Sequence, residues 1–321
     1  MPSLDSVKVH GRRVLVQSMR ACVRRDRLPW PFKATYVNGC QRLLAALDIE
    51  SDETPLECDY ETRFVAGPGG PWLNSILRYR GVWEPALSDF IVQHVQAGDV
   101  CVDAGANCGY FTVLLAQRVG PSGKVIAIEA APENVRWMRA NLDINGVQDT
   151  VEVVTAACAR QKGQLTLHVH PQNDAWSRLR PPDEGQLDRR FMGDKWIPVT
   201  VPADTLGSIV GPETDRVSFI KLHIEGAEAE VAPDIPDTFH HPRLVVALLV
   251  KEPHIEVTLK PFRERGFHVY DRRNDYRWFY ERKVPSITEV TYEELNNQHT
   301  AYVLLSRQPL VLPEGKNDSS T

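Results

Sequence analysis

Residues 100–119, VCVDAGANCGYFTVLLAQRV, decide the fold of this chain. The segment opens with a short apolar run that predicts a buried strand, and the stretch from Tyr110 onward predicts a helix that Gly120-Pro121 ends. Between them, Gly105 and Gly109 allow a sharp turn and a close approach of the backbone to a ligand. Amide groups at the start of such a helix point toward bound molecules, so the segment predicts a site for a polar or negatively charged group.

An alternation of strand-like and helix-like stretches continues from Gly98 onward. Pro132 suits the first turn of a second helix, whose apolar residues recur every three or four positions until Gly146 stops it. Several candidate strands are apolar throughout, as strands covered on both faces are. The pattern predicts a doubly wound, mostly parallel, Rossmann-like α/β sheet. The candidate strands are 100–104, 124–130, 151–157, 164–170, 217–225, 243–250, 268–271 and 301–306.

The remaining segments suggest three parts. Residues 1–80 show no sustained period and predict an N-terminal cap, 81–310 form the α/β domain, and 311–321 form a flexible tail. The polar stretch 171–195 predicts a long loop, either a lid over the substrate or an excursion without function.

Composition excludes several classes of protein. The chain has 321 residues, 42% hydrophobic and 25% charged, with a net charge of -5, which fits a soluble globular protein and gives no general attraction to nucleic acid. Arginine pairs at 12-13, 24-25 and 272-273 are interpreted as solvated faces. Six cysteines without a CxxC pair indicate reduced thiols, and no apolar stretch is long enough for a membrane span, so we expect a cytoplasmic protein.

Glu129 supplies the second half of a nucleoside site. It ends the second strand, where a carboxylate can accept hydrogen bonds from both hydroxyls of a ribose. The loop from Gly105 reads G-A-N-C-G, with Asn107 where a dinucleotide fingerprint has its middle glycine, which disfavours a pyrophosphate. S-adenosylmethionine fits, with its amino-acid end near Asp103 and its adenine beside Ala157.

Two rival classes remain. A nicotinamide-dependent oxidoreductase needs a loop that holds pyrophosphate, and this loop speaks against it. A binding protein that keeps the cofactor pocket but has lost catalysis is the other alternative, and cofactor turnover with any acceptor separates it from an enzyme.

Four stretches together resemble the FkbM family of methyltransferases. They are Val102–Thr112, similar to the family's DvGANxGxxt; Ile128–Asn134, similar to fEPxpxn with Ala130 in place of proline; Phe219–Glu228, similar to iKiDvEGxE with His223 in place of Asp; and Gly81–Glu84, similar to GxyE. The resemblance covers about 80 to 306. It implies a seven-stranded sheet whose last strand is antiparallel, and O-methylation of a hydroxyl on a sugar, polyketide or similar natural-product intermediate.

The expected cofactor site combines the loop, the second strand end and the resemblance. Its candidate residues are Glu84, Asp103, Gly105, Ala106, Asn107, Gly109, Tyr110, Glu129, Ala130 and Ala157.

His223 is the candidate catalytic base. Histidine takes up protons near neutral pH, and this one ends a predicted central strand, where α/β sheets bind their ligands. A structural histidine is the alternative. Glu225 could orient it or hold the cofactor amine, and Glu228 could also cap the next helix. Because imidazole is a poor ligand for Mg²⁺, we expect no metal.

The acceptor itself is left open. It is expected to be a small molecule, and N-methylation is the alternative to O-methylation. Trp176 and the aromatic run Tyr276–Tyr280 could line its pocket, although buried aromatic residues are more often core. No nucleic acid or membrane partner is expected, and the oligomeric state is open, a homodimer being one option.

The loop chemistry yields a first prediction. S-adenosylhomocysteine should bind in a calorimetric titration and NAD should not, because the loop lacks the middle glycine that a pyrophosphate needs. Tight binding of NAD with none of S-adenosylhomocysteine would exclude the interpretation.

Overall fold

The computed structural model describes residues 55–65, 71–169, 196–224, 226–272 and 287–312, with isolated helical positions between 11 and 43. The segments 171–195 and 276–280, Trp176 and Glu225 lie outside the described residues. None of the described helices has the length and apolar character of a membrane span.

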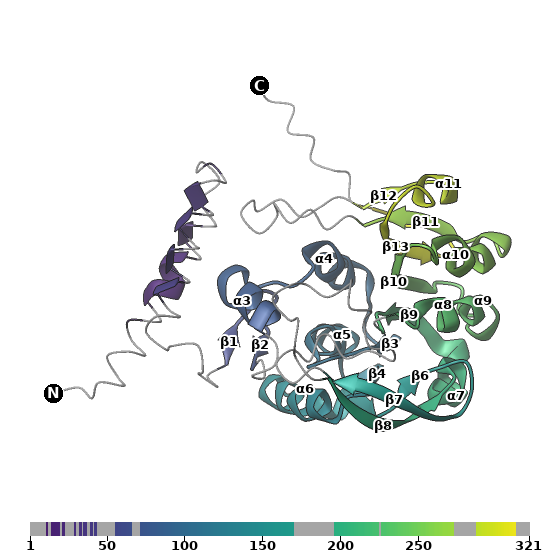
Figure 1. Cartoon of the computed structure of the whole chain (residues 1–321), viewed down its shortest axis with the longest axis horizontal. Coiled ribbons are helices and arrows are strands. Elements are labelled where there is room, and N and C mark those ends of the chain that lie inside the picture. The colour runs from purple at the N-terminus through teal and green to yellow at the C-terminus, as the bar shows by residue number, and fades with distance from the viewer. Residues whose placement is uncertain are drawn as a thin grey trace.

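A central sheet of eight strands organises the domain, and the prediction of a doubly wound, mostly parallel sheet is confirmed (Figure 1). Six strands run in the same direction: β10, β9, β3, β4, β5 and β11. The last strand in the chain, β13, is antiparallel to its two neighbours β10 and β11, as the resemblance implies. A two-residue edge strand, β12, adds to the expected seven. In spatial order the strands are β12 (Thr288–Glu289), β11 (His268–Asp271), β13 (Thr300–Ser306), β10 (Val245–Lys251), β9 (Val217–Leu222), β3 (Val100–Ala104), β4 (Lys124–Ile128) and β5 (Val151–Val154).

Helices cover both faces of this sheet, which explains why β3 and β9 are buried along their whole length (Figure 1). One face carries α3 (Pro71–Arg80), α4 (Pro85–His94), α5 (Tyr110–Val119) and α6 (Pro132–Asn145). The other carries α7 (Leu206–Val210), α8 (Glu228–Val231), α9 (Ile235–Thr238), α10 (Ile255–Glu264) and α11 (Tyr292–Leu295). The predicted bounds of α5 and α6 are confirmed.

Two buried clusters, one on each face, follow from the two-residue period of the strands. Val100 and Val102 of β3 point into the cluster under α7, α9 and α10. Cys101 of β3 and Phe219 of β9 point into the cluster under α4 and α5. Asp103 and Lys221 follow the same alternation, so both charged side chains lie on the α4–α5 face.

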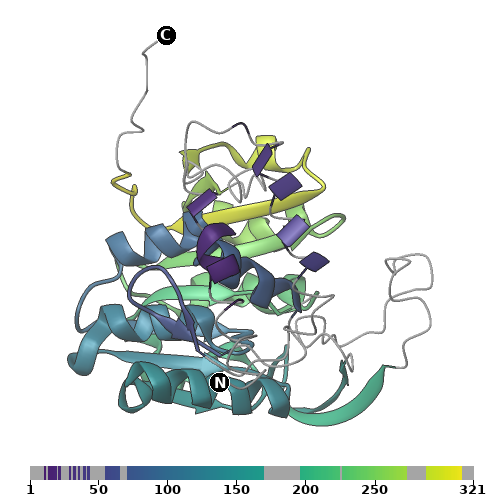
Figure 2. The ribbon, with the colours of Figure 1, turned by 90° about the vertical axis from the view of Figure 1, so that its left-hand side faces the viewer.

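A second sheet differs from the expected pattern (Figure 2). The candidate strand 151–157 divides into β5 and β6 (Ala157–Cys158), and β6 pairs with β8 (Ile197–Asp204). The candidate strand 164–170 is β7 (Gly163–Val169), which pairs with β8 rather than joining the central sheet. The sequence interpretation missed β8, because Pro198 and Pro202 interrupt it and prolines argue against a strand.

A short hairpin joins the described part of residues 1–80 to the α/β domain. It consists of β1 (Leu56–Glu57) and β2 (Arg63–Phe64), and Phe64 belongs to the buried cluster under α4 and α5. The side chain of Asn141 in α6 accepts from Val65 N at 2.7 Å and donates to Val65 O and Cys108 O at 2.9 and 2.8 Å. One fully buried amide therefore connects the hairpin, α6 and the loop before α5.

Asn141→Ala should lower the free energy of unfolding by about 2–4 kcal/mol, because it leaves three backbone groups without their partner. Chemical denaturation measures this. Asn145→Ala is the control: this half-buried residue bonds Arg63 N and O, and its loss should cost about 1 kcal/mol or less. Equal effects would show that burial of the amide does not matter.

Candidate active site

The loop between β3 and α5 is packed so tightly that its glycines are required. Gly105 has φ +74°, and a Cβ there would lie 1.8 Å from the carbonyl oxygen of His223. Gly109 has φ +88°, and a Cβ there would lie 2.8 Å from Cγ of Met138. Both positions combine a left-handed backbone with a close neighbour, as the sequence predicts.

The amides of this loop bond within the protein, which corrects part of the sequence interpretation. Gly105 N and Ala106 N donate to Ile128 O at 2.9 and 3.0 Å, and Asn107 N donates to Glu129 Oε2 at 2.7 Å. Cys108 N is held by the Asn107 side chain. The turn brings these groups against β4, so the first-turn amides of α5 are the ones left for a bound group.

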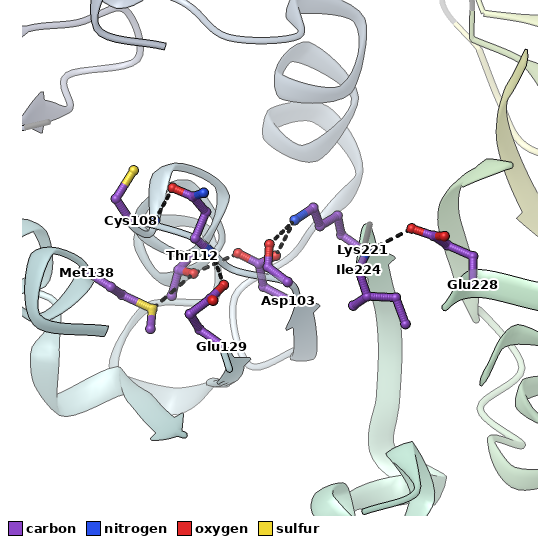
Figure 3. A network of polar contacts seen from close by, with 10 residues as sticks. Asp103, Cys108, Thr112, Glu129, Met138, Lys221, Ile224 and Glu228 are labelled. Atoms are coloured by element: carbon purple, nitrogen blue, oxygen red, sulfur yellow. Dashed lines mark hydrogen bonds and ion pairs between the residues drawn. The ribbon is translucent and has the colours of Figure 1, made fainter. Parts of the chain in front are cut away.

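Lys221 of β9 holds the loop through its ammonium group (Figure 3). Its Nζ lies 3.0 Å from Asp103 Oδ1 and donates to Gly105 O at 2.7 Å. The other carboxylate oxygen of Asp103 accepts from Thr112 Oγ1 at 2.7 Å. Asp103 is completely buried, so its carboxylate interacts with Lys221 and Thr112 rather than with solvent. These contacts fix the shape of the loop.

Glu129 lies just past β4, at the edge where the loop begins. Its carboxylate accepts from Asn107 N at 2.7 Å, Ala131 N at 2.9 Å and Asn134 Nδ2 at 3.3 Å. Burial raises the pKa of Glu129, and these hydrogen bonds offset part of that rise. The neighbouring Asn134 Oδ1 is buried and has no hydrogen-bond partner among the described residues, so it is available to a donor on a bound molecule.

Glu84 borders the same edge from the start of α4. It has a left-handed backbone, is buried, and forms an ion pair with Arg272, the residue that follows β11. Burial raises the pKa of Glu84, but electrostatic interactions with Arg272, His223 and Lys221 and the hydrogen bond from Arg272 outweigh it, so the pKa is lowered overall. The interpretation of the 272-273 pair as a solvated face is wrong for Arg272, which is 3% exposed.

Tyr110, the first residue of α5, fixes the approach of the chain to Glu84. Its hydroxyl accepts from Trp83 N at 3.1 Å and bonds Ser88 Oγ at 3.2 Å. Ser88 in turn donates to Trp83 O at 2.6 Å. The segment before α4 is thereby attached to the start of α5, which places Glu84 beside the loop.

His223 follows the last residue of β9 and lies between the loop and a cavity. Its backbone N donates to Ala104 O at 3.0 Å and so continues the pairing of β9 with β3. The cavity, about 130 Å³, opens between the ends of β9 and β10. It is lined by His223, Gly226, Glu228, Ala229, Leu249, Val250, Lys251 and His254.

Glu228 ties down the turn that follows His223 (Figure 3). Its two carboxylate oxygens accept from Ile224 N at 2.8 Å and Gly226 N at 2.9 Å. Its side chain makes no capping bond to α8, whose N-cap is Ala227. Glu228 therefore orders the β9–α8 turn and does not cap α8; its other two expected roles, orienting His223 and holding the cofactor amine, stay predictions.

Ala130 and Ala157 lie farther along the edge, toward the second sheet. Both belong to, or pack against, a buried cluster that includes Leu167 of β7 and Val201 of β8. The three-stranded sheet of β6, β8 and β7 therefore borders the candidate site next to the end of β5.

The structure brings most predicted site residues to the carboxyl edge of the sheet, around the β3–α5 loop. Sequence reasoning missed three residues there, Lys221, Arg272 and Asn134. A lysine inside the otherwise apolar run VSFIKL was a usable signal for Lys221. No local signal marks Arg272, since its partner Glu84 is 188 positions away.

Two curated methyltransferases are similar to this chain in sequence. Methyltransferase sdnD of Sordaria araneosa is 25% identical over 214 residues, which cover 58% of this chain and 80% of that protein. Catechol O-methyltransferase of Sus scrofa is 38% identical over 160 residues, covering 49% of this chain and 73% of that protein.

Two solved structures are similar at low identity. An SAM-dependent O-methyltransferase from Thermotoga maritima has a TM-score of 0.40 at 15% identity, covering 84% of this chain and 83% of that one. TYW2 of M. jannaschii in complex with AdoMet has a TM-score of 0.40 at 14% identity, covering 80% and 87%. The model of the methyltransferase FkbM domain matches residues 103–268, just over half of the chain. The chain belongs to the FkbM family of S-adenosylmethionine-dependent methyltransferases.

Proposed function

We propose that the chain methylates a hydroxyl of a small cytoplasmic metabolite, such as a sugar, polyketide or similar natural-product intermediate, without a metal and with His223 as general base. One observation carries the proposal. The backbone carbonyl of His223 lies against the cofactor loop at Gly105, and His223 also lines the cavity at the carboxyl ends of β9 and β10. A group in this place can reach both a methyl donor on the loop and an acceptor in the cavity.

The residues along the sheet edge fit S-adenosylmethionine. Glu129 offers a buried carboxylate to the ribose hydroxyls, and the unpaired oxygen of Asn134 beside it suits a further donor of the nucleoside. Asp103 acts through the loop that it shapes with Lys221. The proposal assigns cofactor binding to Glu84, Asp103, Gly105, Ala106, Asn107, Gly109, Tyr110, Glu129, Ala130 and Ala157.

The proposed chemistry needs positioning and one proton transfer. When bound, S-adenosylmethionine supplies an electrophilic methyl group whose bond to sulfur breaks with both electrons staying on sulfur. The acceptor oxygen forms the new bond to carbon as His223 takes its proton, so the imidazole ends the step positively charged. Orientation in the cavity contributes up to ~7–11 kcal/mol, and the base about 10²–10⁴-fold in rate.

Histidine at position 223 favours a metal-free site. The resemblance places an aspartate here, and carboxylate oxygens are what Mg²⁺ prefers. Imidazole is a poor ligand for Mg²⁺ but a good base near neutral pH. Glu225, the expected orienting partner of His223, lies outside the described residues, and His223 alone carries the proposed base role.

Glu129→Ala should weaken binding of S-adenosylhomocysteine at least about tenfold, because hydrogen bonds to a charged group are worth ~1.5–3 kcal/mol. Calorimetry measures the affinity, and thermal unfolding checks the fold. Glu133→Ala is the control, since this exposed acid in the first turn of α6 bonds only Trp137 Nε1 and Arg136 among the described residues. Unchanged affinity in folded Glu129→Ala would place the ribose elsewhere.

His223→Asn should bind S-adenosylhomocysteine normally but lose ~10²–10⁴-fold in turnover, measured as S-adenosylhomocysteine formed with hydroxylated acceptors that the wild type methylates. Activity of the wild type should rise with pH through the imidazole titration and withstand chelators. His241→Asn, at the opposite edge of the sheet, should behave as wild type. Full turnover in His223→Asn would make the residue structural, and restoration by Mg²⁺ after chelation would refute the metal-free mechanism.

A further inference from the structure

Arg272 is a buried cation at the end of β11, outside the stretches that resemble the family motifs. It is 3% exposed, and three contacts hold it. Its Nη1 pairs with Glu84 Oε2, its backbone N donates to Tyr302 O at 2.7 Å, and its guanidinium lies 5.4 Å from the centre of the Tyr302 ring. The side chain is therefore fixed, with its charge directed at Glu84.

Glu84 lies on the same face of the sheet as His223. In β9, Phe219 and Lys221 point toward α4 and α5, and His223 continues that two-residue period because its N–H still pairs with β3. Glu84 begins α4 on this face, and the bonds between Trp83 and Tyr110 hold it beside the loop that His223 touches. Electrostatic interaction between Glu84 and His223 is among the causes of the lowered pKa of Glu84.

A carboxylate this deeply buried would take up a proton if no cation stood beside it. Burial alone raises the pKa of Glu84, and Arg272 is the largest cause that acts in the other direction. Removing one partner of a buried ion pair leaves an uncompensated charge, which the protein avoids by neutralising the group. Arg272 is therefore the group that does most to keep Glu84 charged, ahead of His223 and Lys221.

We propose that Arg272 is a positioning residue that keeps Glu84 ionised, so that Glu84 stabilises the positive charge that His223 acquires when it takes the proton of the acceptor. The inference rests on the proposed role of His223 as base. Glu84 interacts electrostatically with His223, and Arg272 acts on His223 through Glu84. No further proton moves: the proton from the acceptor hydroxyl stays on His223, and Glu84 remains a carboxylate throughout.

Among the described residues, other charged groups near His223 come from four neighbouring elements. Lys221 lies on β9, Glu228 on α8, Lys251 on β10 and His254 at the start of α10. Lys221 is paired with Asp103, and both oxygens of Glu228 are bonded to backbone amides. None of these groups is altered in the Glu84 and Arg272 variants, so the direction in which the titration of His223 moves separates loss of the Glu84 charge from loss of repulsion by Arg272.

The test follows His223 directly and needs no acceptor. In the complex with S-adenosylhomocysteine, the Cε1–H signal of His223 is identified in a ¹H–¹³C NMR spectrum by its loss in His223→Asn, and its titration midpoint is then measured. Glu84→Gln should lower that midpoint by at least about 0.5 pH unit, since a nearby opposite charge favours the imidazolium. Arg272→Met should lower it in the same direction, because Glu84 becomes protonated, and Arg272→Lys should restore it.

Arg243→Met is the matched control, because it breaks an ion pair with Asp99 near the start of β3 and should leave the midpoint unchanged. A midpoint that rises in Arg272→Met would show that Arg272 acts on His223 by direct repulsion and would overturn the proposal. So would an unmoved midpoint. If Arg272→Met does not fold, the other two variants decide. An unmoved midpoint in Glu84→Gln overturns the proposal, and so does a lowered midpoint in Arg272→Lys. Full turnover of His223→Asn would instead remove the base role while leaving the midpoint shifts intact.

Discussion

The ion pair between Lys221 and Asp103 is the interaction on which the rest of the site depends. The two residues are direct partners in the parallel pairing of β9 with β3, and both are almost completely buried. Burial of two charges costs several kcal/mol per ion unless their geometry and additional hydrogen bonds compensate. Here Thr112 donates to Asp103, Gly105 O accepts from Lys221, and the Phe111 ring lies under the ammonium. A slip of one residue in the strand register would leave both charges unpaired.

This pair also links the cofactor loop to the proposed base. Because Lys221 fixes β9 against β3, the next residues of β9 are placed as well, and His223 meets Gly105 with no room for a side chain between them. Glu228 then orders the turn beyond His223 through two backbone amides. A disturbance of Lys221 would therefore reach both sides of the site, the loop that binds the donor and the cavity proposed for the acceptor.

Elements that depend on a local sequence pattern can be predicted from the sequence. Elements and contacts that depend on residues far apart in the chain cannot. The strand, glycine turn and helix of residues 100–119 lie close together in the chain, and so their bounds could be read correctly. β8 escaped notice because it forms only by pairing with β6 and β7, against the preference of its two prolines. Arg272 resembles a surface residue in the sequence for the same reason: its partner Glu84 is 188 positions away in the chain. The family resemblance supplied candidate positions such as Glu84, but not the contacts that set their charge.

A histidine at position 223 is electrostatically compatible with the buried Glu84–Arg272 pair. An aspartate at 223, which the resemblance would place there, would set a second carboxylate opposite Glu84, and two like charges in a buried site raise each other's pKa. Such a site would need a further cation to keep both groups ionised. A histidine removes that conflict, because it is neutral before the proton transfer and positive after it. The fixed negative charge of Glu84 then favours the state that the proposed reaction creates, and Arg272 prevents that charge from being lost to protonation.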